Sequence, residues 1–87
     1  MTTPADANGV IVVAATDRAG TRIASYSSRG PSPTGKRPHL AAPGGEDDQE
    51  NSIRTLLIGG DAGRAGHGTS CATPMVSGVV ALLLEAN

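Results

Sequence analysis

The sequence predicts an α/β fold in which a few short parallel strands pack against one apolar helix. A continuous β-branched run at Val10–Ala15 and an almost wholly apolar C-terminal stretch carry this prediction, together with the glycine- and proline-rich turns between them. A strand that is apolar on both faces is typical of a parallel sheet covered on both sides. Because 87 residues supply one convincing helix and three or four strands, we expect part of a larger layered domain.

Four short segments are expected to form strands. Each is bounded by residues typical of turns, such as Gly, Pro, Asn and Asp. The segments are Val10–Ala15, Arg22–Tyr26, His39–Ala42 and Ile53–Ile58.

The segment Gly44–Asn51 carries four of the eight acidic residues. A metal site could use such carboxylates, but only with spaced oxygen ligands on an ordered loop. A solvated surface loop is the interpretation that such a charge run favours. A glycine-rich approach at 61–68 then leads to Thr69 and Ser70.

The final segment, from about Ser70 to Ala86, is expected to be a buried helix. Pro74 lacks an N–H and is tolerated in a first turn, so the helix should begin near Thr69–Cys71. Beyond Pro74 the apolar residues leave almost no polar stripe, which is typical of a helix with neighbours on every side.

Composition excludes several classes of partner. A net charge of −1 gives no electrostatic case for nucleic acid or an anionic membrane. The longest apolar run, Val79–Leu84, is far shorter than the ~20 residues that cross a bilayer. The first nine residues show no secretory signal, and the compartment is not encoded. One cysteine, Cys71, allows no internal disulfide.

Ser70 stands where a helix N-terminus gathers unpaired N–H groups and a partial positive charge, which stabilise an oxyanion. Gly66 and Gly68 remove side chains that would crowd an incoming peptide. Taken alone, these features also fit a simple N-cap at Ser70 or Thr69. The spacing from Gly63 to Ser70 meets a phosphate-loop pattern poorly, because Thr69 replaces the essential lysine.

The stretch "GHGTSCATPMVSGVVALLL" resembles the serine motif of subtilisin-like serine proteases, the subtilase or peptidase S8 family. Upstream, "VIVVAATDRAGTRIASYSSRGP" resembles the family's strand and its Ser-Ser-x-Gly-Pro turn, and "RPHLAAPG" its Ala-Pro-Gly segment. The order and rough spacing match over nearly the whole chain. The resemblance implies a partial three-layer subtilisin-like fold, with residues 1–87 as the C-terminal segment of the catalytic domain.

The resemblance implies endopeptidase activity, with Ser70 as the catalytic nucleophile. Gly66, His67, Gly68 and Thr69 would lie beside a peptide or protein substrate. The family's acid, histidine and oxyanion asparagine precede this region, so we expect the 87 residues to be inactive alone. No cofactor is implied. Relatives can bind calcium, but His39 stands where they usually carry aspartate, which does not support such a site here.

Three functional hypotheses remain open. The chain could be a piece of a subtilisin-like protease, or half of a split protease completed by a chain with the acid and histidine. It could also be a non-catalytic interaction module, which function retained after Ser70→Ala would favour. His67 is not expected to act as the base, and zinc at His39, His67 and Cys71 lacks a fourth ligand. Cys71 fits a small packed hydrophobe better than a reactive thiol.

Overall fold

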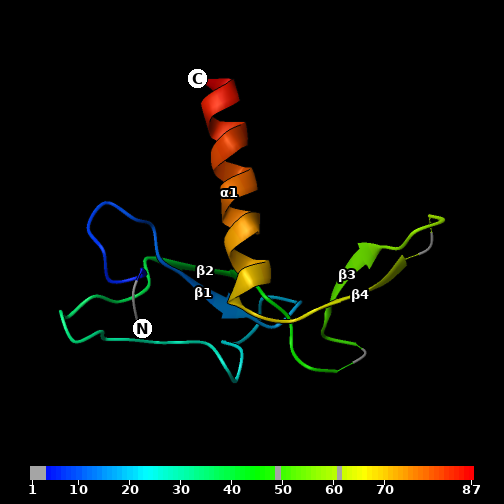
Figure 1. The fold of residues 1–87 in the computed structure, drawn as a ribbon, viewed down its shortest axis with the longest axis horizontal. Coiled ribbons are helices and arrows are strands. Elements are labelled where there is room, and N and C mark those ends of the chain that lie inside the picture. Colours follow the sequence, from blue (N-terminus) through cyan, green and yellow to red (C-terminus); the bar gives the residue numbers. More distant parts are fainter. Residues whose placement is uncertain (1–3, 49, 61) are drawn as a thin grey trace.

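A computed structural model describes residues 4–48, 50–60 and 62–87. Along this part of the chain, four strands precede a long C-terminal helix (Figure 1). The elements are β1 (Val13–Thr16), β2 (Leu40–Pro43), β3 (Ile53–Leu56), β4 (Ala62–Gly66) and α1 (Thr69–Ala86). β1 and β2 form a parallel pair, whereas β3 and β4 form an antiparallel hairpin. The predicted α/β class is confirmed.

The start of α1, which carries Ser70, packs against the parallel β1–β2 pair. Val13 lies opposite Leu40 and Thr16 opposite Pro43. The ladder is extended at its start by the His39 N–H, which donates to the Val12 carbonyl at 2.8 Å. Because parallel strands end at the same edge of a sheet, the turn that follows β2 lies beside the end of β1.

Two strand predictions were wrong. The segment Arg22–Tyr26 forms no strand, since only Ile23 makes an isolated antiparallel bridge, to Thr16. β4 was missed, because its alanine and glycine content is typical of a loop rather than a strand. β4 is a strand because its backbone pairs with β3. This pairing outweighs the low strand propensity of its alanine and glycine residues. The remaining strands lie close to their predicted positions, with ends shifted by a few residues.

α1 packs on one face of the β1–β2 pair by its N-terminal end (Figure 1). Ala72, fully buried, meets Ala15, Ala24 and Ala42, and Val76 packs against this cluster. An alanine buries only one methyl group, so the cluster removes little apolar surface from water.

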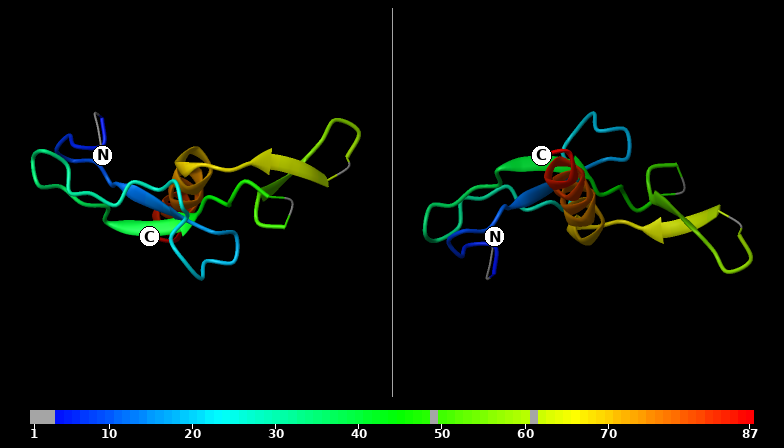
Figure 2. Two further views of the ribbon diagram at one scale, coloured as in Figure 1. Left: turned by 90° about the horizontal axis from the view of Figure 1, so that it is seen from below. Right: turned by 90° about the horizontal axis from the view of Figure 1, so that it is seen from above.

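The molecule is extended rather than compact. Its Cα radius of gyration is 14.2 Å, against about 12 Å for a compact domain of this length. The far half of α1 stands clear of the strands, and the β3–β4 hairpin extends to one side (Figures 1 and 2). An open apolar groove runs between residues 9–13 and one side of α1. These features leave a large part of the apolar surface exposed.

The helix begins at Thr69, as predicted, but its surroundings differ from the expectation. Ala72 is its buried residue, whereas Leu82, Leu83 and Leu84 are between 64% and 71% exposed. Pro74 lies in the second turn rather than the first. By length and composition α1 could cross a membrane, a test that core helices of soluble proteins also pass. The short run at Val79–Leu84 had pointed away from such a segment.

Candidate active site

Ser70 is exposed in the first turn of α1. The N-cap is Gly68, and no side chain caps the helix, so neither Ser70 nor Thr69 serves as its N-cap. Gly68 has φ +143°, a backbone conformation that a residue with a Cβ rarely adopts. The first N–H groups of a helix have no partner within it, and Ser70 contributes one of these groups beside its own hydroxyl.

The loop before Ser70 is held by the turn that follows β2. The Gly68 N–H donates to the Gly44 carbonyl at 2.9 Å. A Cβ at Gly44 would come within 2.7 Å of the Gly68 oxygen, the Ala15 Cβ and the Tyr26 hydroxyl. Only glycine allows this approach. The Ala-Pro-Gly turn at residues 42–44 therefore sets the distance between the sheet and residues 66–69, the serine loop.

Tyr26 lies beneath the same loop. Its hydroxyl donates to the Gly45 carbonyl at 2.8 Å. Partial burial raises the pKa of the phenol, and the negative charge of Glu46 acts in the same direction. The neutral, hydrogen-bonded form is the one that the folded chain favours.

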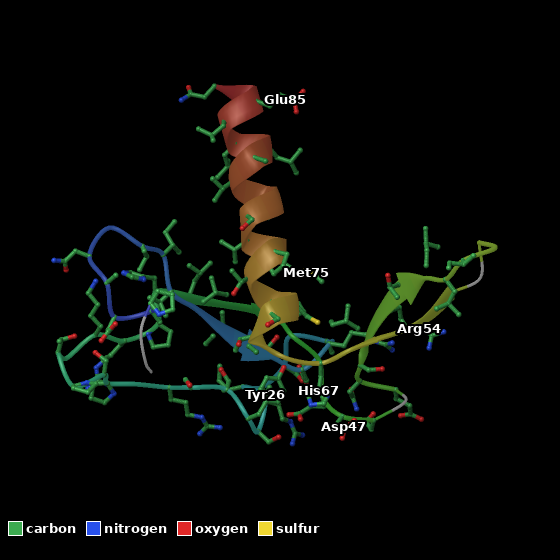
Figure 3. The ribbon with its side chains drawn as sticks, viewed as in Figure 1. Tyr26, Asp47, Arg54, His67, Met75 and Glu85 are labelled. Carbon is green, nitrogen blue, oxygen red and sulfur yellow. The ribbon has the colours of Figure 1, made fainter. Side chains whose placement is uncertain are left out.

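His67 faces Tyr26 and Asp47 (Figure 3). The rings of Tyr26 and His67 have centroids 5.2 Å apart and are tilted by 58°, a separation typical of aromatic contacts. The His67 Nδ1 lies 3.8 Å from an Asp47 carboxylate oxygen. Within the described residues, no hydrogen bond joins an imidazole to the Ser70 hydroxyl. That His67 is not the base stays a prediction.

The described acidic residues of the acidic segment form hydrogen bonds with Ser25 and with the segment's own backbone. Glu46 accepts the Ser25 N–H at 2.7 Å and the Ser25 hydroxyl at 2.9 Å. Asp48 accepts the backbone N–H groups of Glu50 and Asn51. In the described part of the chain, no three His, Cys, Asp or Glu side chains gather as a metal site would require.

His39 is hydrogen-bonded to the start of the sheet. Its Nδ1 accepts the Val12 N–H at 2.9 Å, beside the backbone bond between the same two residues. Calcium prefers oxygen ligands, which an imidazole does not offer. The residue at this position therefore does not fit a calcium site.

The sequence indicated Ser70 and the loop at 66–69, and the structure places them together at the start of α1. The supporting residues Tyr26, Gly44 and Glu46 were missed. The only sequence signal for them was that they lie in or beside the motifs shared with the family. Their roles depend on contacts between segments that are distant in the sequence. Cys71 is half-buried and forms no disulfide.

The Subtilase family model matches residues 1–87. The chain belongs to the subtilase family. It is 47% identical over 68 residues to subtilisin-like protease SBT3.3 of Arabidopsis thaliana, covering 74% of this chain and 8% of that protein. The same figures hold for SBT3.4, and SBT3.7 of the same plant is 44% identical with the same coverage. No solved structure matches.

Membership confirms the resemblance, and the relatives that match are themselves named subtilisin-like proteases. The chain spans about 8% of the length of the curated relatives it matches. The roles of Ser70 and the loop 66–69 stay predictions, as does the assignment of residues 1–87 to the C-terminal part of a catalytic domain.

Proposed function

We propose that this chain supplies the nucleophile of a subtilisin-like endopeptidase that cleaves peptide bonds in peptides or proteins. The observation that carries the proposal is the exposed Ser70 in the first turn of α1, directly after a glycine loop. The helix N-terminus adds a partial positive charge at the place where an oxyanion would form. Family membership gives this placement its chemical meaning.

In the proposed reaction the Ser70 hydroxyl oxygen attacks the substrate carbonyl carbon while a histidine accepts its proton. The tetrahedral oxyanion faces the Ser70 N–H. The histidine then gives the proton to the leaving amine, and water hydrolyses the acyl-enzyme. Gly66, His67, Gly68 and Thr69 lie beside the bound peptide, where the absence of side chains at the two glycines admits its backbone.

We infer that the base and its orienting acid come from protein outside these 87 residues, either from an earlier part of one polypeptide or from a complementing chain. The nearby imidazole of His67 is engaged with Tyr26 and Asp47. A serine hydroxyl without a base is a weak nucleophile. The small alanine cluster and the uncovered half of α1 support the need for additional protein.

The test uses the purified 87-residue chain, alone and mixed with a polypeptide that carries the acid and histidine segments of a plant relative. We expect no turnover of a fluorogenic peptide and no fluorophosphonate labelling for the chain alone. In the complex, both should appear and be lost with Ser70→Ala. Ser77→Ala, on the same helix, is the matched control and should leave both unchanged.

Turnover or labelling that persists in Ser70→Ala would overturn Ser70 as nucleophile. Labelling of Ser70 in the chain alone would overturn the requirement for an external base. A stable complex without Ser70-dependent labelling would contradict the proposed activity as a whole.

A further inference from the structure

We propose that Tyr26 is a positioning residue for Ser70, fixing the Gly44–Gly45 turn that holds the serine loop. This role rests on the proposed function, since positioning matters only if Ser70 reacts. Tyr26 itself touches neither Ser70 nor the site of the reacting atoms in the described contacts. It acts through the backbone between them, both by way of the turn and through a backbone hydrogen bond with Gly68, which lowers the pKa of its phenol.

The first link runs from the phenol to the turn. The Tyr26 hydroxyl donates to the Gly45 carbonyl at 2.8 Å. It also lies so near Gly44 that a Cβ there would be 2.7 Å away. A side chain that both bonds and abuts the turn restricts its displacement towards Tyr26.

The second link fixes the turn from the other side. The N–H groups of Gly44 and Gly45 both donate to the Thr16 carbonyl at 3.0 Å, at the end of β1. The turn is thus held between the end of β1 and the Tyr26 hydroxyl. The Gly44 carbonyl of the same turn accepts the Gly68 N–H at 2.9 Å.

The third link reaches the nucleophile. Gly68 is the N-cap of α1, and its carbonyl accepts the first backbone bond of the helix, from the Cys71 N–H at 2.9 Å. Ser70 lies between these two residues. A shift of the Gly44 carbonyl therefore moves Gly68, which sets the position of Ser70. Small displacements of a reacting group lower the reaction rate strongly.

Tyr26 also contacts the loop through its ring, which lies 5.2 Å from the His67 ring. The two contacts can be separated, because phenylalanine keeps the ring and removes only the hydroxyl. Tyr26 is 37% exposed and lies outside the buried alanine cluster. Loss of its hydroxyl should leave that cluster intact.

The experiment compares Tyr26→Phe with Ser32→Ala, a control that removes a buried hydroxyl bonded to the Lys36 N–H in a separate turn. In the complex with the complementing polypeptide, Tyr26→Phe should lower kcat by roughly three- to tenfold, the range that one neutral hydrogen bond represents. KM should change less than about twofold. Ser32→Ala should leave both constants near their original values.

A second measurement needs no activity. In the isotopically labelled 87-residue chain, Tyr26→Phe should speed hydrogen exchange at the Gly68 amide by a similar factor. The His39 amide, bonded to Val12 on the sheet, should keep its rate. Equal acceleration at both amides would indicate general loosening and overturn the positioning role.

Unchanged kcat and unchanged Gly68 exchange in Tyr26→Phe would also overturn it, while loss of turnover in Ser70→Ala would show that the proposed function stands. Turnover that survives Ser70→Ala overturns the proposed function instead. The exchange rates then report separately whether Tyr26 restrains Gly68.

Discussion

The Gly68 N–H donates to the Gly44 carbonyl at 2.9 Å, joining the turn after β2 to the residue that caps the serine helix. The two glycines are 24 positions apart in sequence, yet this bond makes the Ala-Pro-Gly turn part of the support for Ser70. The stability of the turn and the geometry of the candidate nucleophile are therefore coupled.

Gly44→Ala should destabilise the chain by about 1–3 kcal/mol, the usual cost of overpacking a tight site. The added Cβ would lie 2.7 Å from three atoms, two of them on the serine loop and on Tyr26. Urea denaturation followed by circular dichroism measures the change. Equal stability of variant and parent would contradict the close approach.

Gly78→Ala should have the opposite sign. Gly78 lies inside α1, and a Cβ there would meet nothing within 4 Å. Alanine favours a helix over glycine by about 0.5–1 kcal/mol, so the variant chain should melt at a higher temperature. If the complementing polypeptide packs closely on this side of α1, the same variant will bind it more weakly, which titration of the complex can measure.

The Asp17 carboxylate should stabilise the chain in a pH-dependent way. Its pKa is lowered chiefly by the Thr21 hydroxyl, with help from the Thr21 N–H. A lowered folded-state pKa gives stability that is present above the unfolded value of 3.8 and is lost as pH falls through the folded value. Thr21→Val should flatten this loss below pH 3.8, whereas Thr21→Ser should retain it. Thermal melts across acidic pH test the difference, and identical profiles for the two variants would count against the assignment.

Tyr26 should titrate above pH 10.0, its ordinary value. It is the single tyrosine of a chain without tryptophan, so near-ultraviolet absorbance of the phenolate follows one residue. A raised folded-state pKa means that stability present below pH 10.0 is lost as pH rises through the folded value. Glu46→Gln removes a nearby negative charge and should lower the midpoint, while Glu85→Gln at the end of α1 should not. A midpoint at or below 10.0 in the parent chain is the contrary result.

The uncovered half of α1 should drive self-association in the absence of other protein, because large exposed apolar patches favour contact. Val79 and Leu83 are 55% and 64% exposed and share one helix face. Replacing both with Gln should shift sedimentation towards monomer, whereas Ser77→Gln should not. A monodisperse parent chain that melts cooperatively would show that this surface does not associate.

The sequence was sufficient for elements whose pattern is local. The β-branched run gave β1 within a few residues, and the apolar C-terminal stretch gave the start of α1 at Thr69. It failed where tertiary pairing decided the outcome. β4 is a strand because β3 pairs with it, and the segment around Ile23 has no partner strand to extend its single bridge.

The candidate site divides in the same way. Ser70 and the glycine loop form one continuous motif, which the sequence displays directly. Tyr26 contacts Gly44 across 18 positions of the chain, and Gly44 bonds to Gly68 across 24 positions. Neither residue type predicts such a role by itself. Burial of α1 was expected from its composition, but it depends on neighbours that these residues do not supply.

Pro74 in the second turn of α1 has a mechanical consequence for Ser70. Proline has no hydrogen on nitrogen, so residue 74 cannot tether the Ser70 carbonyl from one turn further on. The backbone at Ser70 is thereby held to the second turn of α1 by one hydrogen bond fewer than in a helix without this proline. Movements of Ser70 should therefore be transmitted less directly to the leucine-rich end of the helix.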